Sequence, residues 1–439
     1  MKVLKFGGTS VGSPQRMKDV AKLITDGERK IVVLSAMSGT TNTLVEISDY
    51  LHKKNPDGAN EVINRLENKY KQHINELFST EEFRQKGMEL LKVRFELLRS
   101  YTKDLFTLFE ERIVLAQGEL LSTTMVNYYL QEQGVKSVLL PALDFMRTDK
   151  NAEPDLPYIK ERLAQQLEAN PDAEIYITQG FICRNAYGEV DNLQRGGSDY
   201  SASLIGAAVK ADEIQIWTDI DGMHNNDPRI VDKTSPVRHL HFEEAAELAY
   251  FGAKILHPTC IQPAKYANIP VRLLNTMDPK AEGTMISNET EKGKIKAVAA
   301  KENITAIKIK SSRMLLAHGF LRKVFEIFEK YQTSIDMICT SEVGVSVSID
   351  DTKHLNEILN DLKKYGIVTV DHDMCIICVV GDLRWENVGF EAKALDAMRE
   401  IPVRMISFGG SDYNISFLVS KDDKKRALQS LSDHLFNND

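Results

Sequence analysis

The amino-acid sequence predicts an α/β fold, in which one large unit with a largely parallel sheet precedes two small α+β modules. Short apolar runs alternate with helical patterns over roughly the first 290 residues, as expected when helices cover both faces of a parallel sheet. The order of helices and strands then repeats about 70 residues apart, which indicates an internal repeat. The composition, 43% hydrophobic and 27% charged, is that of a globular protein.

Length and charge limit the functional classes. A chain of 439 residues is long enough for roughly three domains. The net charge of -8 and the pI near 5.8 argue against nucleic acid as a partner. No apolar run approaches the roughly 20 residues that cross a bilayer, so no membrane partner is expected. The strand pattern begins at once, which leaves no room for a signal peptide and predicts a cytoplasmic protein.

The 5 cysteines are scattered and odd in number, which argues against a disulfide framework. Cys375 and Cys378 form a C-x-x-C motif within the apolar run Met374–Val380. Because residues three apart on a strand point to opposite faces, we expect a buried strand there rather than a zinc or redox site.

The chain opens with a short apolar strand that carries Lys5 and runs into a glycine-rich turn. Gly7 and Gly8 allow the backbone to approach an anion, and a predicted helix at Pro14–Ile24 would add its positive N-terminus. Ser13 stands where a Walker A loop has its lysine, so this is not a Walker A loop. The stretch predicts a phosphate cradle, and an ordinary strand–turn–helix start is the alternative.

The first half of the chain continues the strand–helix alternation. A second strand at Lys30–Ser35 ends in the hydroxyl-rich turn Ser35–Asn42. A helical stretch, Ala59–Leu130, is expected to break near Phe78–Glu82, and Gln117–Leu120 places a carboxylate beside a helix-breaking glycine. Further strands are expected at Val135–Pro141, Glu174–Gln179, Glu213–Thr218 and Pro270–Leu274, and helices at Asp155–Ala169, Tyr200–Lys210 and Phe242–Lys254.

The stretch Asn192–Ser201 leads into the helix expected at Tyr200. Arg195 can bind a carboxylate through two hydrogen bonds, and Asp199 can accept hydrogen bonds from an ammonium group. The alternative is structural, because Ser198 or Asp199 could cap the helix. The stretch therefore predicts either a site for an amino acid or a helix start.

A second polar stretch follows a strand end at Ile216–Gly222. Thr218 and Asp219 suit contacts to a ribose or a metal, and His224 and Arg229 suit a base or a phosphate. A plain Asx-rich loop is the alternative. Further along, Lys254 ends a predicted helix, where a lysine usually complements the helix dipole.

The last third reads as a linker followed by the repeat. The linker is expected at Glu282–Lys296, and a short strand at Ala297–Ala300 is expected to pair with the second module. The first module shows a helix at Gly319–Tyr331 and strands at Ser334–Thr340 and Gly344–Ile349, and the second shows a helix at Phe390–Arg399 and strands at Val403–Phe408 and Tyr413–Val419.

Taken in order, these stretches resemble the aspartate kinases (aspartokinases) of the amino-acid-kinase family, over essentially the whole chain. The tail resembles the lysine-sensing ACT module through Gly319–Leu321, Ser334–Asp336 and Thr340–Glu342. The catalytic strings that carry the resemblance are Lys5–Gly12, Ser35–Asn42, Gly118–Glu119, Arg195–Asp199, Trp217–Asp219, Asp227–Arg229 and Phe251–Pro258.

The resemblance implies an amino-acid-kinase fold over residues 1–292, a first ferredoxin-like ACT module over 303–370, and a second over 296–302 with 371–439. It implies an enzyme of a single function, since the 439 residues leave no space for a homoserine dehydrogenase domain. The implied reaction is ATP-dependent phosphorylation of the β-carboxylate of L-aspartate, with Mg²⁺. This is the first step of lysine, threonine and methionine biosynthesis.

Roles are implied residue by residue. Lys5, Lys254 and Asp199 would be catalytic, with both lysines on the phosphates. Since a carboxylate is already a nucleophile, the reaction needs no general base, and neither Asp199 nor Asp219 is assigned as one. Aspartate would be held by Ser35, Thr41, Glu119, Arg195, Ser198 and Asp199, and ATP by Lys5, Gly7, Gly8, Thr218, Asp219, His224, Arg229 and Lys254.

The ACT resemblance implies feedback inhibition by L-lysine through a homodimer, with a tetramer left open. Asp336 and Glu342 suit a cationic effector, and strand-end caps in a dimer interface are the alternative. The implied effector residues are Met314, His318, Gly319, Phe320, Leu321, Ser334, Ile335, Asp336, Thr340, Ser341 and Glu342.

Three departures from the family pattern stand out. His224 replaces a common tyrosine, Gln194 replaces a common glycine, and the loop at Arg147–Asp149 is followed by a shortened segment. Two other functions remain alternatives at this point: another amino-acid kinase, such as a glutamate 5-kinase, and a non-catalytic amino-acid sensor.

Overall fold

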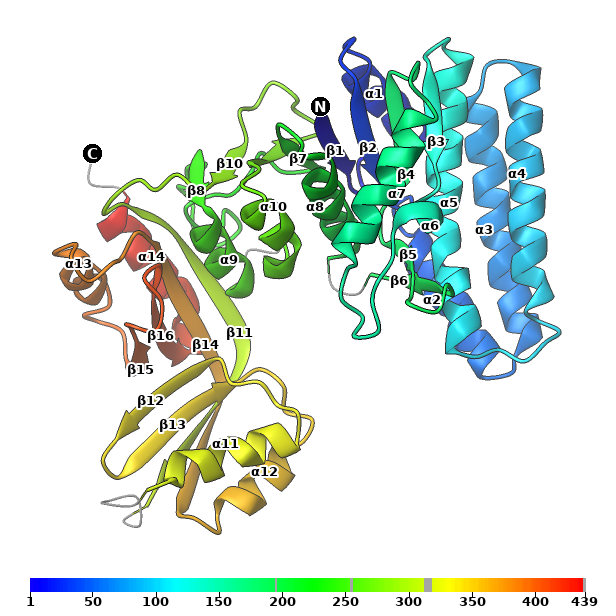
Figure 1. Ribbon diagram of the computed structural model, residues 1–439. Helices are drawn as coiled ribbons and strands as arrows, with labels where there is room; N and C mark the ends of the chain where they lie inside the picture. The colour runs from blue at the N-terminus through cyan, green and yellow to red at the C-terminus, as the bar shows by residue number, and fades with distance from the viewer. Residues whose placement is uncertain (194–195, 253–255, 312–317, 437–439) are drawn as a thin grey trace. The chain divides into compact units, whose positions relative to one another are not determined.

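The computed structural model in Figure 1 describes residues 1–193, 196–252, 256–311 and 318–436. Its packing divides the chain into two compact units, the first made of Met1–Met223 and Leu256–Asn288, the second of His224–Ile255 and Glu289–Asp439. By packing, residues 224–255 belong with the C-terminal part, although they lie inside the predicted catalytic range. That predicted domain boundary at residue 292 remains a proposal.

The first unit is built on a largely parallel sheet. Its strands lie in the order β3-β4-β2-β1-β7-β9-β10, and among these neighbours β9 and β10 alone are antiparallel. The predicted buried parallel sheet is therefore confirmed. The strands are β1 (Lys2–Phe6), β2 (Lys30–Leu34), β3 (Ser137–Leu140), β4 (Ile175–Gln179), β7 (Ile214–Thr218), β9 (Val271–Asn275) and β10 (Thr284–Ser287).

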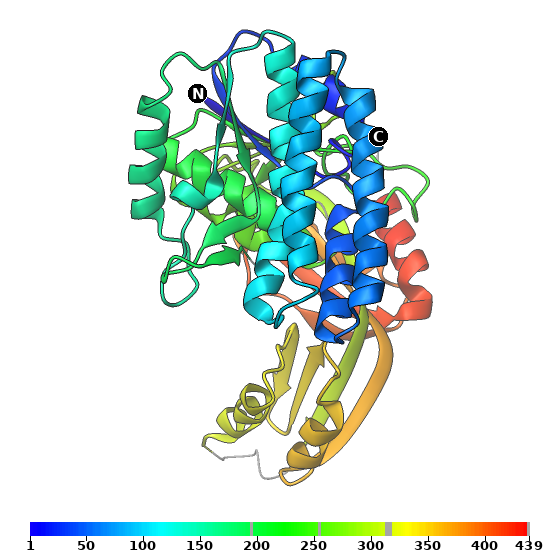
Figure 2. The same cartoon turned by 90° about the vertical axis from the view of Figure 1, so that its right-hand side faces the viewer.

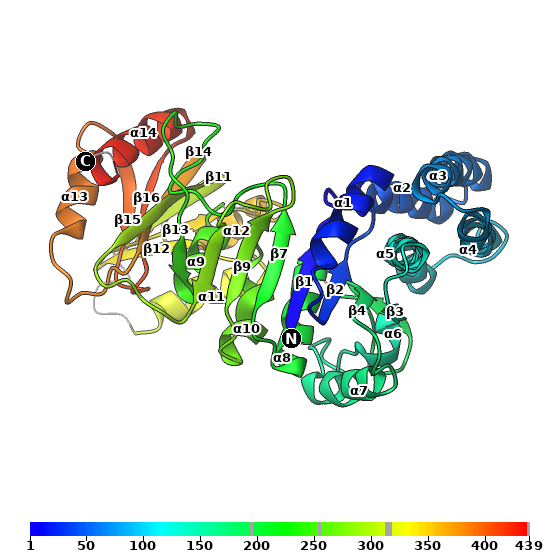
Figure 3. The same ribbon diagram turned by 90° about the horizontal axis from the view of Figure 1, so that it is seen from above.

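Helices cover both faces of this sheet, as Figure 3 shows for α1 and α8. Alternate strand residues, such as Leu4 and Phe6, join one apolar core with α1 to α5. In Figure 2, α3, α4 and α5 run alongside one another. One face carries α1 (Pro14–Ile24), α2 (Thr40–His52), α3 (Pro56–Leu77), α4 (Glu81–Ser100) and α5 (Leu108–Glu132), and the remaining helices are α6 (Ala142–Phe145), α7 (Leu156–Glu168), α8 (Gly197–Val209), η1 (Pro258–Ile261) and α10 (Gln262–Tyr266).

Local sequence explains where these helices begin. Ser13 caps α1 by accepting a hydrogen bond from the Arg16 amide, and Pro14 occupies the first turn, where it loses no hydrogen bond. The break expected near residues 78–82 lies between α3 and α4. A further break at residues 101–107 was not predicted. There Thr107 and Glu110 form a capping box that begins α5.

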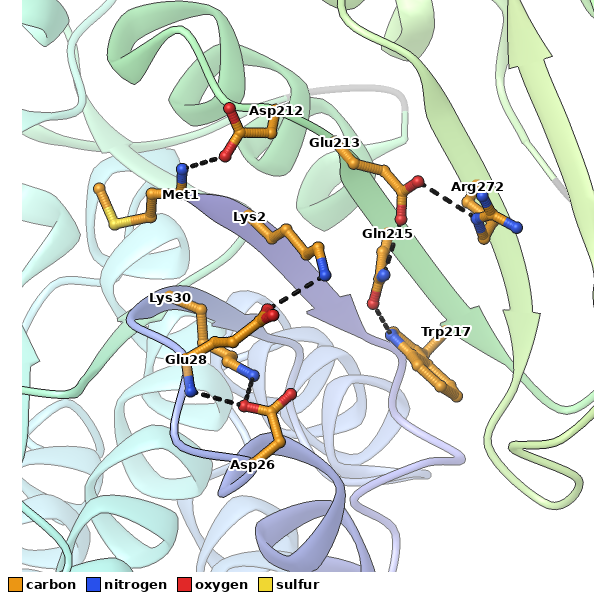
Figure 4. A network of polar contacts seen from close by, with 10 residues as sticks. All are labelled: Met1, Lys2, Asp26, Glu28, Lys30, Asp212, Glu213, Gln215, Trp217 and Arg272. Carbon is orange, nitrogen blue, oxygen red and sulfur yellow. Dashed lines mark hydrogen bonds and ion pairs between the residues drawn. The ribbon is translucent and has the colours of Figure 1, made fainter.

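Polar contacts tie together the amino ends of the central strands (Figure 4). The amine of Met1 pairs with Asp212, and Lys2 Nζ lies 3.0 Å from Glu28 Oε2. Glu213 accepts a hydrogen bond of 3.2 Å from Arg272 Nε. These contacts lie at the amino ends of the strands, whereas the predicted site residues gather at the carboxyl ends.

The second unit contains a six-stranded antiparallel sheet in the order β12-β13-β11-β14-β16-β15. Two long strands, β11 (Ile295–Lys310) and β14 (Ile367–Gly381), pair along most of their length. The shorter elements are β12 (Met337–Ser341), β13 (Gly344–Ile349), β15 (Val403–Ser407), β16 (Asn414–Ser420), α11 (Phe320–Lys330), α12 (Leu355–Leu362), α13 (Phe390–Ala397), η3 (Lys421–Asp423) and α14 (Lys424–Leu435).

Each half of the long strands serves a different core. Ile307 and Ile309 of β11 pack with α11 and α12, whereas Val298 packs with α13 and α14. Ala297–Ala300 pairs with the β14 segment 377–380, so the expected pairing of this short strand is confirmed. The predicted linker, by contrast, contains β10, and α12 and α14 were not predicted.

The Cys375–Cys378 stretch is a buried part of β14, as expected, and none of the 5 cysteines forms a disulfide. Within the described ranges, no helix is both long and apolar enough to cross a membrane.

The segment 224–255 packs against the C-terminal sheet through α9 (Phe242–Tyr250), which β8 (His239–His241) precedes. Glu247 of α9 accepts hydrogen bonds from Ser411 Oγ at 2.7 Å and from Asn414 Nδ2 at 2.6 Å. α9 ends at Tyr250, four residues earlier than predicted; residues 253–255 lie outside the described ranges.

Candidate functional site

The candidate site lies at the carboxyl ends of the parallel strands of the first unit, where ligands of open α/β sheets bind. Lys5 is one residue from the end of β1, in register with Val33 of β2 and Ile216 of β7. Its Nζ lies 2.7 Å from Asp199 Oδ1, and the two side chains are 13% and 15% exposed. The sheet and α8 therefore join a lysine and a carboxylate that are 194 positions apart in the sequence.

The turn after β1 is tightly packed. A Cβ on Gly8 would lie 2.8 Å from the Ala36 carbonyl oxygen, so a larger residue at this position would push the turn away from β2. Gly7 N donates to Trp217 O, and the Gly8 carbonyl accepts from Ser38 N at 3.1 Å. A glycine-rich turn followed by the N-terminus of α1 is thus present, as the phosphate-cradle prediction requires.

Two predicted substrate residues meet directly. Ser35 Oγ, at the end of β2, donates to Ser198 Oγ at 2.9 Å. Ser198 lies in the first turn of α8, which begins at Gly197 rather than at Tyr200 as predicted. The N-cap is Gly196, with a left-handed φ of 78°, so neither Ser198 nor Asp199 is the N-cap residue. The capping alternative for those two residues is thus wrong.

Glu119 is a buried carboxylate in the middle of α5, 4% exposed. Its Oε1 accepts a hydrogen bond of 3.1 Å from the Ala36 amide, and its Oε2 is buried without a partner among the described residues. Burial raises the pKa of Glu119 to about 7. An unpaired buried carboxylate oxygen of this kind suits an incoming ammonium group.

The glycine beside it does not break the helix, contrary to the expectation for Gln117–Leu120. α5 continues through Gly118, where a Cβ would lie 2.7 Å from the Ala36 Cβ. Gly118 therefore allows α5 to approach the turn after β2, and this approach places Glu119 at the Ala36 amide.

Thr218 is the last residue of β7 and Asp219 follows it; Thr218 Oγ1 donates to Asp219 Oδ1 at 3.1 Å. Thr218 O accepts from Thr276 N, and Thr276 Oγ1 forms a buried 2.7 Å contact with Ser10 Oγ. The strand end is thus tied to the glycine-rich turn.

Supporting residues were missed by the sequence reasoning. A Cβ on Gly180, just after β4, would lie 2.4 Å from Ser198 Oγ, so only glycine leaves room for Ser198. A Cβ on Gly196 would lie 1.9 Å from Cys260 Sγ, so Cys260 supports the turn that begins α8. The position of Gly180 directly after a strand was a sequence feature that could have identified it as a supporting residue. No feature of the sequence marked Cys260.

The remaining predicted site residues are not placed with this group by any described contact. Thr41 is exposed in the first turn of α2. His224 and Arg229 belong to the second unit, where His224 Nδ1 lies 3.0 Å from Thr234 Oγ1 and Arg229 pairs with Asp227. Gln194, Arg195, Lys254 and Met314 lie outside the described residues.

Those predicted effector residues that the structure describes lie in the second unit, around α11 and β12. Asp336 stands out because its side chain is 1% exposed, whereas Glu342 is exposed. Phe320 is buried in the core of α11 and α12. Among the rest, Ile335 is partly buried and His318, Gly319, Leu321, Ser334, Thr340 and Ser341 are exposed.

Among the described residues, the group at the carboxyl ends of the strands combines the Lys5 ammonium and a glycine-rich turn with three carboxylates and three hydroxyls: Glu119, Asp199, Asp219, Ser35, Ser198 and Thr218. In the described ranges, no group of three or more His, Cys, Asp and Glu side chains is placed to bind a metal ion. Asp219 nonetheless fits Mg²⁺ held mainly by phosphate oxygens, because that ion commonly uses only one or two carboxylates.

Comparisons with known proteins agree with this arrangement. Residues 1–275 match the amino acid kinase family and residues 377–435 match the ACT domain. The chain is 33% identical to the lysine-sensitive aspartokinase 3 of Escherichia coli over 99% of both chains. It is 34% identical to the chloroplastic aspartokinase 1 of Arabidopsis thaliana, over 99% of this chain and 80% of the relative.

Solved structures extend the similarity to the fold. The E. coli aspartokinase III in complex with aspartate and ADP (R-state) has a TM-score of 0.84 at 32% identity, over 99% of this chain and 100% of that one. The same enzyme with lysine and aspartate (T-state) has a TM-score of 0.82 at 33% identity, over 99% of each chain. The predicted fold class is confirmed, and the chain belongs to the aspartokinases of the amino acid kinase family.

Proposed function

We propose that the chain phosphorylates the β-carboxylate of L-aspartate with ATP, giving 4-phospho-L-aspartate. The observation that carries the proposal is the Lys5–Asp199 pair at the carboxyl ends of the strands, because it joins the predicted phosphate turn to the predicted aspartate site. Family membership supports the substrates, since a related aspartokinase binds aspartate and ADP. In a biosynthetic context, this reaction is the first step toward lysine, threonine and methionine.

The aspartate side of the site would use Arg195 for the α-carboxylate, and Glu119 or Asp199 for the ammonium group. Glu119 suits the ammonium because one of its oxygens is buried and unpaired. Ser35 and Ser198 already share a hydrogen bond, and both can turn toward a substrate carboxylate. Thr41 completes the proposed set.

The phosphate side would use Lys5 and Lys254 with the turn at Gly7 and Gly8. Of the two glycine amides, Gly8 N is the one proposed for the phosphates, because Gly7 N donates to Trp217 O. Thr218, Asp219, His224 and Arg229 are the other proposed ATP residues. Mg²⁺ would neutralise phosphate charge, and Asp219 is the described carboxylate that we propose for it.

The chemistry needs alignment rather than a base. A β-carboxylate oxygen of aspartate forms a bond to the γ-phosphorus while the bond from that phosphorus to the bridging oxygen of ADP breaks. No proton moves, so the protein must hold two anions in line and offset the charge of the transferring group. The ion pair with Asp199 holds the Lys5 ammonium in place before ATP binds.

The regulatory part of the proposal is feedback inhibition by L-lysine through the predicted ACT modules, in a homodimer. The lysine-bound T-state of a relative supports the effector. A cytoplasmic location is also proposed, because ATP is the substrate and the cysteines are thiols.

A hydroxamate assay for acyl phosphate tests the proposal directly. With ATP and Mg²⁺ we expect product from L-aspartate and at most a trace from L-glutamate. Product from glutamate alone would favour a glutamate 5-kinase, and no product from either would favour a sensor.

A further inference from the structure

Asp336 is the centre of a charged cluster in the second unit. Its Oδ1 accepts a hydrogen bond of 2.7 Å from Lys301 Nζ and another of 2.7 Å from the Tyr250 hydroxyl. Lys301 Nζ also lies 2.8 Å from Asp350 Oδ2 and 4.4 Å from the centroid of the Tyr250 ring. One lysine is thus shared between two aspartates.

The cluster is asymmetric. The Asp336 side chain is 1% exposed, and its Oδ2 is buried without a hydrogen-bond partner among the described residues. Asp350, in contrast, is 42% exposed. A buried carboxylate oxygen without a hydrogen-bond partner costs free energy. An ammonium group offsets this cost best, because its hydrogen bond to a carboxylate is charge-assisted.

The same cluster reaches α9. Tyr250 is the last residue of α9, and two residues later Gly252 packs on β11, where a Cβ would lie 2.3 Å from the Ala300 carbonyl oxygen. Ala300 precedes Lys301 on β11. The chain from Tyr250 to Gly252 is therefore held at two adjacent points of β11, directly before Lys254 in the sequence.

These contacts suggest how an effector would be sensed. We infer that Lys301 is an internal cation that shares Asp336 with the ammonium of the effector, and that the Tyr250 hydroxyl transmits occupancy of Asp336 to α9 and the segment leading to Lys254. The inference rests on the proposed inhibition by L-lysine. An incoming ammonium must displace Lys301 toward Asp350, because two ammonium groups on one carboxylate repel each other.

Two substitutions should shift effector affinity in opposite directions. In Lys301→Met the competitor is gone, so we expect the Kd for L-lysine to fall at least fivefold. In Asp350→Asn the competitor loses its second partner and stays on Asp336, so we expect the Kd to rise at least threefold. Isothermal titration of the full-length protein measures both, with L-norleucine, which lacks the side-chain ammonium of lysine, as a ligand control.

Lys308→Met is the matched control, since Lys308 is an exposed lysine on the same strand. It should bind L-lysine as the wild type does. If Lys301→Met instead binds L-lysine equally or more weakly, Lys301 is a structural or direct binding residue and the inference is overturned. Asp350→Asn still tests the inference if Lys301→Met fails to fold.

Tyr250→Phe tests the coupling. We expect it to bind L-lysine within about threefold of the wild type while saturating lysine inhibits it several-fold less. Tyr331→Phe is matched chemically, because the Tyr331 hydroxyl donates to Asp361 at 2.9 Å elsewhere in the unit, and it should keep full inhibition. Full inhibition of Tyr250→Phe would overturn the coupling role.

The wild type separates the two levels of the proposal. If it forms aspartyl phosphate but neither binds L-lysine nor is inhibited by it, the proposed regulation and this inference both fall while the catalytic proposal stands. If it binds lysine and the variants behave as their controls do, the inference alone falls.

Discussion

Lys5 and Lys2 lie on one strand, yet they have different surroundings. Lys5 pairs with Asp199 at the carboxyl end of β1, whereas Lys2 pairs with Glu28 at the amino end. Only the first lies where ligands of such sheets bind. The two lysines therefore separate a catalytic role from a general contribution of charge.

Lys5→Met should fold but lower kcat by at least about 100-fold, because one cation on the transferring phosphate is lost. Lys2→Met, the control on the same strand, should keep near-normal turnover. The hydroxamate assay measures both. Near-normal turnover of Lys5→Met would remove Lys5 from the mechanism.

Glu119 should make stability depend on pH. Burial raises its pKa to about 7 from a usual value of 4.5, so between these pH values the folded protein holds a proton that the unfolded chain has released. The free energy of unfolding contributed by this group therefore falls as pH rises from about 4.5 to about 7 and stays constant at higher pH, where both states are deprotonated.

Glu119→Gln removes that dependence. Without substrates, we expect its Tm to match the wild type near pH 5 and to exceed it by a few degrees near pH 8, in thermal scans across pH. Glu89→Gln, on the exposed side of α4, should shift Tm equally at both pH values. Glu119→Gln should also raise the KM for aspartate. A constant Tm difference would contradict the argument.

At the scale of elements, close approach matters more than helix propensity in α5. Alanine in place of glycine usually stabilises a helix by up to about 1 kcal/mol. At Gly118 the added Cβ would meet Ala36, and overpacking costs about 1–3 kcal/mol. Packing should win.

We therefore expect Gly118→Ala to lower stability and to raise the KM for aspartate, since Ala36 carries the amide that binds Glu119. Ala36→Gly in the same chain should restore part of both losses, because it removes the clashing methyl. Chemical denaturation and kinetics of the two single variants and the double variant form the test. Additive losses would show that the two sites are independent.

Periodicity and turn chemistry were enough to predict the parallel strands of the first sheet and α1, because these depend on local patterns, whereas β10 was read as part of a linker. Contacts between segments that are distant in the sequence could not be predicted from local patterns. The start of α8 was misplaced because Gly196 is held against Cys260, which follows it by 64 positions. Gly118 was read as a helix breaker because its partner Ala36 lies on another element.

At the scale of the whole chain, residues 224–255 pack with the C-terminal part although they precede it. Asn226 Nδ2 donates to Leu428 O at 3.0 Å, Glu247 bonds Ser411 and Asn414, and Tyr250 bonds Asp336. The predicted kinase range therefore depends on partners that lie beyond it in the sequence.

A fragment of residues 1–292 should consequently lose activity by more than about tenfold and become sensitive to proteolysis within residues 224–255. Limited proteolysis with mass spectrometry identifies the cut sites, and the full chain is the control. Wild-type activity and protease resistance of the fragment would show that residues 224–255 hold their structure alone.

The two long strands β11 and β14 have a consequence for how the chain can evolve. Each strand contributes to both small cores, so neither half can be lost, duplicated or exchanged without cutting a strand of the other. An inserted residue would turn every later side chain of the strand to the opposite face. The register shifts between Lys301 and Ala306 separate the two halves, so insertions there are the ones the sheet should tolerate best.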